Sequence, residues 1–129
     1  MLAENGIELI PLAAPTSGLG RVRKISESGS GFLYYVTVAG VTGARKSLPE
    51  TFAKRLAEVR KVSVLPVAAG FGISSPEMAH AAAQSADAVV VGSRLVDLAF
   101  TTYLEKGEEA ALKAAGDFVA SLAAAVRRD

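Results

Sequence analysis

Glycine residues gather where apolar segments of the sequence end, and they are the first sign of a binding site. They are Gly40, Gly43, Gly70, Gly72 and Gly92, the last followed by Ser93. Glycine lets backbone N–H groups approach an anion closely, and a helix that begins just after it directs partial positive charge to the same point. Each glycine alone is equally consistent with a tight turn, but three such loops in succession predict a phosphate site.

Few other side chains in the sequence are candidates for catalysis, metal binding or ligand contact. His80 has no Cys, His or carboxylate partner at ligand spacing, so we expect a packing or surface residue and no metal site. Asp87 precedes an apolar segment, which predicts a turn or capping role at the end of the sheet opposite the glycines. Tyr34 and Tyr35 must point to opposite faces of one strand, so that one lines a site while the other packs under a helix. We expect the charged pair 45–46 to be solvated.

The elements that position these residues alternate between strand and helix. Short apolar runs predict strands at 7–13, 32–38, 64–69 and 87–91. Helical spacing predicts a first helix at about 16–28, capped by Thr16 or Ser17, and a second from 48–50 onward. A third helix is predicted from Ser75-Pro76 through Gln84. A short helix at 95–100 and a long one between 108 and 127 follow. The long helix carries one apolar stripe, formed by Ala111, Ala115, Phe118, Leu122 and Val126.

Four strand-helix units in 129 residues predict a parallel α/β fold in one domain, residues 1–129. A whole (β/α)8 TIM barrel takes about 250 residues, so four units fit a half-barrel. A small doubly wound sheet gives the same alternation, and periodicity does not separate the two.

Composition narrows the class of protein. Half of the residues are hydrophobic and the net charge is +1, which gives no basic footprint for nucleic acid or an anionic membrane. The absence of cysteine excludes disulfides and fits a reducing compartment, so we expect a cytoplasmic location. The N-terminus does not read as a signal peptide, and no apolar run reaches the ~20 residues of a membrane span.

At these motifs the sequence resembles the tryptophan synthase alpha chain family over nearly its whole length. The shared segments are 6–17 ending in Ala-Pro-Thr-Ser, Gly-Phe-Leu-Tyr-Tyr-Val at 31–36, Gly-Val-Thr-Gly-Ala-Arg at 40–45, Gly-Phe-Gly-Ile-Ser at 70–74 and Val-Gly-Ser at 91–93. They correspond to strands five to eight of the family's barrel.

The resemblance implies a lyase that splits indole-3-glycerol phosphate into indole and glyceraldehyde 3-phosphate, and that passes indole to a pyridoxal-phosphate beta subunit. No cofactor is expected in this chain. Carried over by position, the implied substrate-binding residues are Gly43, Gly72, Gly92 and Ser93 around phosphate, Phe71 beside them, Tyr34 at the indole and Thr42 in a mobile loop. The family's catalytic glutamate and aspartate lie in its first half and have no counterpart here.

One residue departs from the family pattern, since Arg94 stands where a small residue is usual. An arginine there either strengthens phosphate binding or crowds the site. Two rival functions remain: another phosphate-binding barrel enzyme, and a non-catalytic half-barrel scaffold. We also expect four strands cut from a closed barrel to self-associate or to pair with a missing half.

Overall fold

A computed structural model describes residues 2–36, 50–70 and 72–127. It contains a short 3-10 turn, four strands and five helices among these residues. In chain order they are η1 (Ala3–Asn5), β1 (Leu12–Ala13), α1 (Leu19–Glu27), β2 (Leu33–Val36), α2 (Glu50–Val62), β3 (Val67–Gly70), α3 (Pro76–Ala83), β4 (Ala88–Val90), α4 (Ser93–Lys106) and α5 (Glu108–Val126). All eight elements of the expected four units are present.

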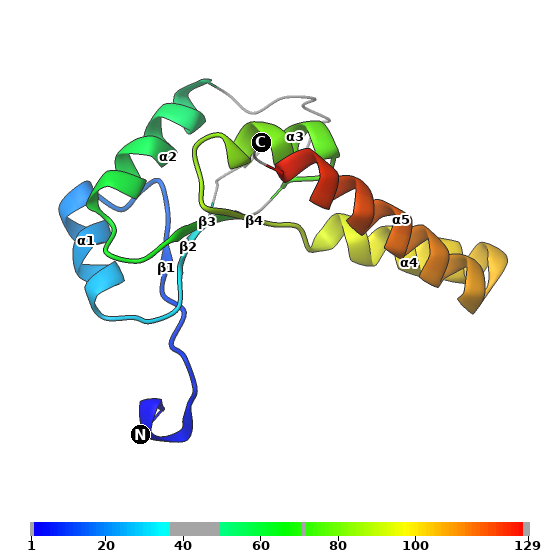
Figure 1. Cartoon of the computed structure of the whole chain (residues 1–129), viewed down its shortest axis with the longest axis horizontal. Helices are drawn as coiled ribbons and strands as arrows, with labels where there is room; N and C mark the ends of the chain where they lie inside the picture. The colour runs from blue at the N-terminus through cyan, green and yellow to red at the C-terminus, as the bar shows by residue number, and fades with distance from the viewer. Residues whose placement is uncertain (1, 37–49, 71, 128–129) are drawn as a thin grey trace.

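The four strands form one parallel sheet in the order β1-β2-β3-β4. A doubly wound sheet reverses its strand order and carries helices on both faces, whereas strands in sequential order form a barrel wall. In Figure 1, α1, α2 and α3 all lie on the same side of the sheet. The fold is therefore an α/β half-barrel of four βα units, and the doubly wound alternative is wrong.

Alternation of burial along β1 and β2 separates a covered face from an open one, whereas all four residues of β3 are buried. In β2, Leu33 and Tyr35 are fully buried, whereas Tyr34 and Val36 are half-buried. Register places Leu12 beside Tyr34, and Leu12 is 61% exposed. The face that bears Tyr34 is the one that would point to the axis of a barrel, and none of the described helices covers it in Figure 1.

The core lies between the covered face and the helices. Its fully buried side chains include Val22 from α1, Leu56 and Val59 from α2, and Val67 from β3. The helical spacing of Leu56 and Val59 in the sequence predicts this inward face of α2, and the structure confirms it. The apolar stripe of α5 is confirmed as well, because its five residues are buried or half-buried.

The first strand is shorter than the sequence predicts. Its apolar run favours pairing from residue 7 onward, yet only Leu12 and Ala13 form the ladder. Pro11 has no N–H to donate, and β1 has a neighbour on one side only, so that few backbone bonds hold the segment. Leu9 bonds to Ser30 instead, with the Leu9 amide donating to Ser30 Oγ at 2.9 Å.

The remaining boundaries differ from the predicted ones by a few residues. β3 begins at Val67 rather than at 64, and β4 is one residue shorter than predicted at each end. Neither Thr16 nor Ser17 caps α1: the cap is Gly18, and Ser17 Oγ accepts from the Ala14 amide at 3.4 Å in the preceding turn. The predicted short helix at 95–100 is the 14-residue α4.

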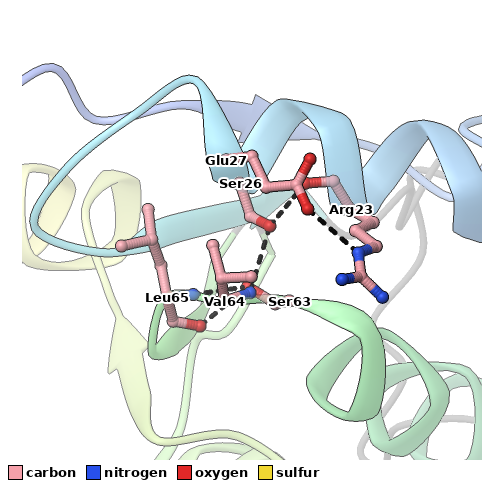
Figure 2. A network of polar contacts seen from close by, with 6 residues as sticks. All are labelled: Arg23, Ser26, Glu27, Ser63, Val64 and Leu65. Carbon is pink, nitrogen blue, oxygen red and sulfur yellow. Dashed lines mark hydrogen bonds and ion pairs between the residues drawn. The ribbon is translucent and has the colours of Figure 1, made fainter.

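A polar network ties α1 to the start of β3 at the amino-terminal end of the sheet (Figure 2). Ser26 is fully buried, and its hydroxyl donates to the Arg23 carbonyl at 2.7 Å while accepting from the Val64 amide at 3.1 Å. Beside it, Ser63 Oγ donates to the Leu65 carbonyl at 2.7 Å. The Ser26 hydroxyl thus bonds both a carbonyl of its own helix and the Val64 amide, which lies 38 residues further along the chain.

Candidate functional site

Two loops meet at the carboxyl-terminal edge of the sheet. The loop after β3 brings Ser74, and the loop after β4 brings Gly92 and Ser93, to one shallow open hollow. The first two turns of α4 complete its lining, with Arg94, Val96, Asp97 and Phe100. This edge of a parallel sheet is where ligands bind in barrel folds.

The start of α4 leaves backbone donors free for a ligand. Gly92 is the N-cap and makes no side-chain cap bond, while the amides of Leu95 and Val96 donate to its carbonyl. The amides of Ser93 and Arg94, in the first turn, have no carbonyl partner within the helix. They are at the positive end of a 14-residue helix dipole, which favours an anion.

Gly92 keeps this approach open. Its φ is −119°, which any residue adopts, and a β-carbon built on it meets nothing within 4 Å. Glycine is therefore not needed here for backbone conformation. The absence of a side chain instead leaves room in front of the free amides of α4.

Gly72 differs, because its φ is +79°. A residue with a side chain is strained in that left-handed conformation. The turn between β3 and α3 thus requires glycine at this position, whatever binds nearby.

Gly70 is needed for a reason different from those at Gly92 and Gly72, and the sequence did not reveal it: Gly70 leaves room for a side chain of the neighbouring strand. A β-carbon at Gly70 would collide with the ring and hydroxyl of Tyr34 on the neighbouring strand. Tyr34 therefore reaches along the open face toward the carboxyl-terminal edge, across the space that Gly70 leaves. The prediction that Tyr34 and Tyr35 point to opposite faces is confirmed.

Arg94 lies at the rim of the hollow. Its guanidinium is 3.7 Å from the carboxylate of Asp97, one turn along α4, and both side chains are largely exposed. The arginine does not crowd the space in front of Gly92. Its charge offsets that of Asp97, the acidic side chain among the described residues that line the hollow.

The structure brings together Gly92 and Ser93 of the residues predicted to bind substrate, and places Gly72 and Tyr34 at the same edge of the sheet. Thr42, Gly43 and Phe71 lie outside the described residues, as do Arg45 and Lys46. Ser74 is a lining residue that the sequence reasoning missed. A signal for it exists, since its hydroxyl follows the glycine-rich segment at the end of β3.

The opposite end of the sheet holds Asp87, as the sequence predicts. Its carboxylate accepts from the Val67 amide at 2.9 Å and pairs with Arg60 at 2.6 Å. Asp87 thus joins the beginnings of β3 and β4. His80, on α3, contacts the Ala125 carbonyl of α5 through Nδ1 at 2.8 Å, which confirms a packing role at the surface.

Known proteins resemble this chain in sequence over almost all of its length. Residues 1–127 match the family model described as "Tryptophan synthase alpha chain". A tryptophan synthase alpha chain of Geobacter sp. (strain M21) is 49% identical over 118 residues, which are 91% of this chain and 42% of that protein. The alpha chain of Citrifermentans bemidjiense is 48% identical over the same shares of both chains.

Solved structures agree in fold. The alpha chain from Legionella pneumophila is 33% identical and superposes with a TM-score of 0.79, covering 96% of this chain and 44% of that one. A structure of the tryptophan synthase α2β2 complex of Pyrococcus furiosus is 35% identical with a TM-score of 0.74, covering 95% and 48%. The chain spans less than half the length of these relatives.

Proposed function

The chain belongs to the tryptophan synthase alpha chain family, and from this premise we propose that it supplies the phosphate-binding half of that enzyme. In the proposed role it holds the phosphate of indole-3-glycerol phosphate, which the whole enzyme splits into indole and glyceraldehyde 3-phosphate. Tryptophan biosynthesis in the cytoplasm is the process to which we assign it.

The observation that carries the proposal is the meeting of Ser74, Gly92 and Ser93 at the start of α4. A phosphate there receives N–H donors from the first turn of the helix and the hydroxyl donor of Ser93. The Ser74 hydroxyl, which donates to Met78 Sδ at 3.6 Å in the structure, becomes a further donor when it turns to the anion. We assign Gly72 to the proposed cradle as well and, by its position in the family pattern, Gly43. Arg94 stands at the rim as a cation within reach of a dianion.

The rest of the substrate is assigned to the open face of the sheet. We propose that Tyr34 contacts the indole, with Phe71 beside the phosphate and Thr42 in the loop after β2. Position in the family pattern supports these three assignments, and for Tyr34 so does its place on the open face beside Gly70.

We assign proton transfer to the other half of the barrel. By family resemblance, the catalytic glutamate and aspartate belong to the first half of the barrel. The chain needs no cofactor for this role, and among the described residues there is no cluster of three metal-ligating side chains. None of the described helices is long and apolar enough to cross a membrane.

The Pyrococcus furiosus relative occurs in an α2β2 complex, which supports a beta subunit as the partner that receives indole. Pyridoxal phosphate belongs to that proposed partner. Binding of the beta subunit is assigned to the assembled barrel, of which this chain contributes four units.

Titration of the chain with inorganic phosphate and with glycerol phosphate, followed by phosphorus NMR and by amide shifts, tests the proposal. Amide shifts should concentrate at Ser74, Gly92, Ser93 and Arg94. Gly92→Asp should abolish binding, because it places a carboxylate before the free amides without backbone strain.

Gly92→Asn is the matched control, since it adds nearly the same volume without charge and should weaken binding less. Gly92 serves better than Gly72 for this test, because any side chain at Gly72 is strained. Shifts that spread over surface arginines and leave α4 unchanged would instead favour a non-catalytic scaffold.

A further inference from the structure

Arg94 and Asp97 form a looser ion pair than others in the described part of the chain. The Arg94 guanidinium is 3.7 Å from the Asp97 carboxylate. Four other ion pairs join their partners at 2.6 to 3.1 Å, among them Lys113 with Asp117 on α5. A charge-assisted hydrogen bond between such groups is about 2.7–2.9 Å long. The Arg94–Asp97 pair is therefore held by charge alone, and its guanidinium N–H groups remain free to bond elsewhere.

Both members of this pair line the hollow that the proposed function assigns to phosphate. Their side chains are 46% and 73% exposed, so that packing fixes neither of them. Asp97 is the only ion-pair partner of Arg94 among the residues that the structure describes, and none of these residues forms a hydrogen bond with the Arg94 side chain. The guanidinium is thus a planar set of donors with one weakly held partner.

The pair keeps the guanidinium out of the space in front of Gly92. Asp97 lies one turn further along α4 than Arg94. A β-carbon built on Gly92 meets nothing within 4 Å, and the Arg94 side chain is among the groups that it does not meet. The space beside the free amides of the first turn is therefore open, with a cation held one turn away.

We propose that Arg94 exchanges Asp97 for the phosphate when the ligand binds, and that Asp97 weakens binding by competing for the guanidinium. This inference rests on the proposed function and names two determinants of ligand affinity at its site. The planar guanidinium offers two parallel N–H donors to two phosphate oxygens. A dianion also attracts the cation more strongly than a single carboxylate does. The exchange therefore favours a phosphate monoester, which carries two charges, over a singly charged diester.

Asp97 opposes the ligand in two separable ways. Its charge repels a dianion directly, whether or not Arg94 is present. Its pairing with Arg94 must also be given up before the guanidinium turns to the phosphate, and this effect exists only while Arg94 is present. Variants at both positions separate the two effects, because only the exchange makes the effect of Asp97 depend on Arg94.

Titration of the whole chain with inorganic phosphate at about pH 7.5, followed by the amide shifts of α4, tests the exchange. The four forms compared are the unaltered chain, Arg94→Gln, Asp97→Asn and the double variant. Arg94→Gln should raise the phosphate dissociation constant about 10-fold, because it removes a charge-assisted contact. Asp97→Asn should lower that constant about 5-fold in the unaltered chain but only about 2-fold in the Arg94→Gln chain.

Two further measurements examine the guanidinium itself. The Nε resonance of Arg94 should move when phosphate is added to the unaltered chain, which tests the exchange even if a substitution unfolds the protein. Arg94→Lys should recover part of the affinity lost in Arg94→Gln, because lysine keeps the charge without the planar fork. Methyl phosphate should bind more tightly than dimethyl phosphate, and Arg94→Gln should reduce that difference.

Matched controls lie at the far end of α4. Lys106→Gln and Glu105→Gln change the net charge as Arg94→Gln and Asp97→Asn do, and both side chains are exposed. The helix from Arg94 to Glu105 is roughly 16 Å long, which exceeds the Debye length of about 10 Å at 0.1 M salt. Neither control should change the phosphate dissociation constant. Circular dichroism checks that every variant is folded.

Two results would overturn the exchange and leave the proposed function intact. One is phosphate binding at α4 with the same affinity in the unaltered chain and in Arg94→Gln. The other is an effect of Asp97→Asn that is equal with and without Arg94, which would reduce the role of Asp97 to direct repulsion. A chain whose α4 amides do not respond to phosphate at all contradicts the proposed function, and the exchange with it.

Discussion

Tyr35 carries a buried polar atom that affects the free energy of unfolding of the half-barrel. Its ring is fully buried beneath the helices, and its hydroxyl has no hydrogen-bond partner among the described residues. The neighbouring Arg55 guanidinium instead donates to Glu58 at 3.1 Å and to the Ser17 carbonyl at 2.9 Å. Burial raises the pKa of the Tyr35 hydroxyl, and the Arg55 guanidinium, through a polar interaction with the hydroxyl that falls outside hydrogen-bond geometry and through its positive charge, only partly offsets this rise.

Tyr35→Phe should therefore raise the free energy of unfolding by about 1 kcal/mol, because it removes an unsatisfied buried hydroxyl and keeps the ring. The unaltered chain should also lose stability as the pH rises above about 10, since the unfolded state then releases the tyrosine proton before the folded state does. Denaturant unfolding at pH 7 and at pH 10.5 measures both effects.

The variant should show a smaller loss between those two pH values. A variant destabilised by more than about 1 kcal/mol at pH 7 would mean that the hydroxyl has a partner whose loss is costly. Tyr34→Phe is the matched control, because Tyr34 is half-buried on the open face and its hydroxyl is not enclosed in the core.

Among the contacts that join one element to another, the contact between α1 and the segment before β3 depends on the Ser26 hydroxyl. Ser26→Ala leaves the Val64 amide without the acceptor that it has at 3.1 Å, in a part-buried setting. We expect a loss of about 1 to 3 kcal/mol in the free energy of unfolding, the cost of an unsatisfied buried donor.

Ser28→Ala is the matched control on the same helix, because the Ser28 hydroxyl is exposed and donates only to the Ile25 carbonyl at 2.8 Å. Thermal or urea unfolding of the two variants gives the difference. Equal stability of the two would show that water replaces Ser26 at the Val64 amide, and that the network in Figure 2 contributes little.

The whole molecule, as a half-barrel, should bind phosphate without turning over substrate. A positioned acid or base contributes roughly 100- to 10,000-fold to a rate, and the proposed function places both carboxylates in another part of the barrel. We expect no indole release from indole-3-glycerol phosphate by this chain alone, under conditions where a full-length alpha chain of a relative is active.

An indole assay with substrate at saturating concentration checks this expectation. Release at a rate comparable to that of the full-length chain would show that residues of this chain perform the proton transfers. Addition of the unmatched part of a relative's chain is the informative control, because recovered activity would show that the binding half is correctly folded.

Short-range patterns in the sequence by themselves determined many of the strands, helix starts and loops of this protein. Apolar runs predicted four strands, and the Ser75-Pro76 pair predicted the start of α3, where Ser75 Oγ accepts from the Met78 amide at 3.3 Å. Glycine after three of the four strands predicted the loops of the site, of which those at Gly72 and Gly92 lie in the described part of the chain. Such signals act over a few residues, so that the sequence alone carries them.

Only the tertiary structure decided what depends on distant segments. The order β1-β2-β3-β4 distinguished a half-barrel from a doubly wound sheet, because strand order is set by packing between units and not within them. The length of β1 was decided by the absence of a second neighbouring strand in the described sheet. The reason for Gly70 lies in the ring of Tyr34, 36 positions away on an adjacent strand, and no local pattern encodes that contact.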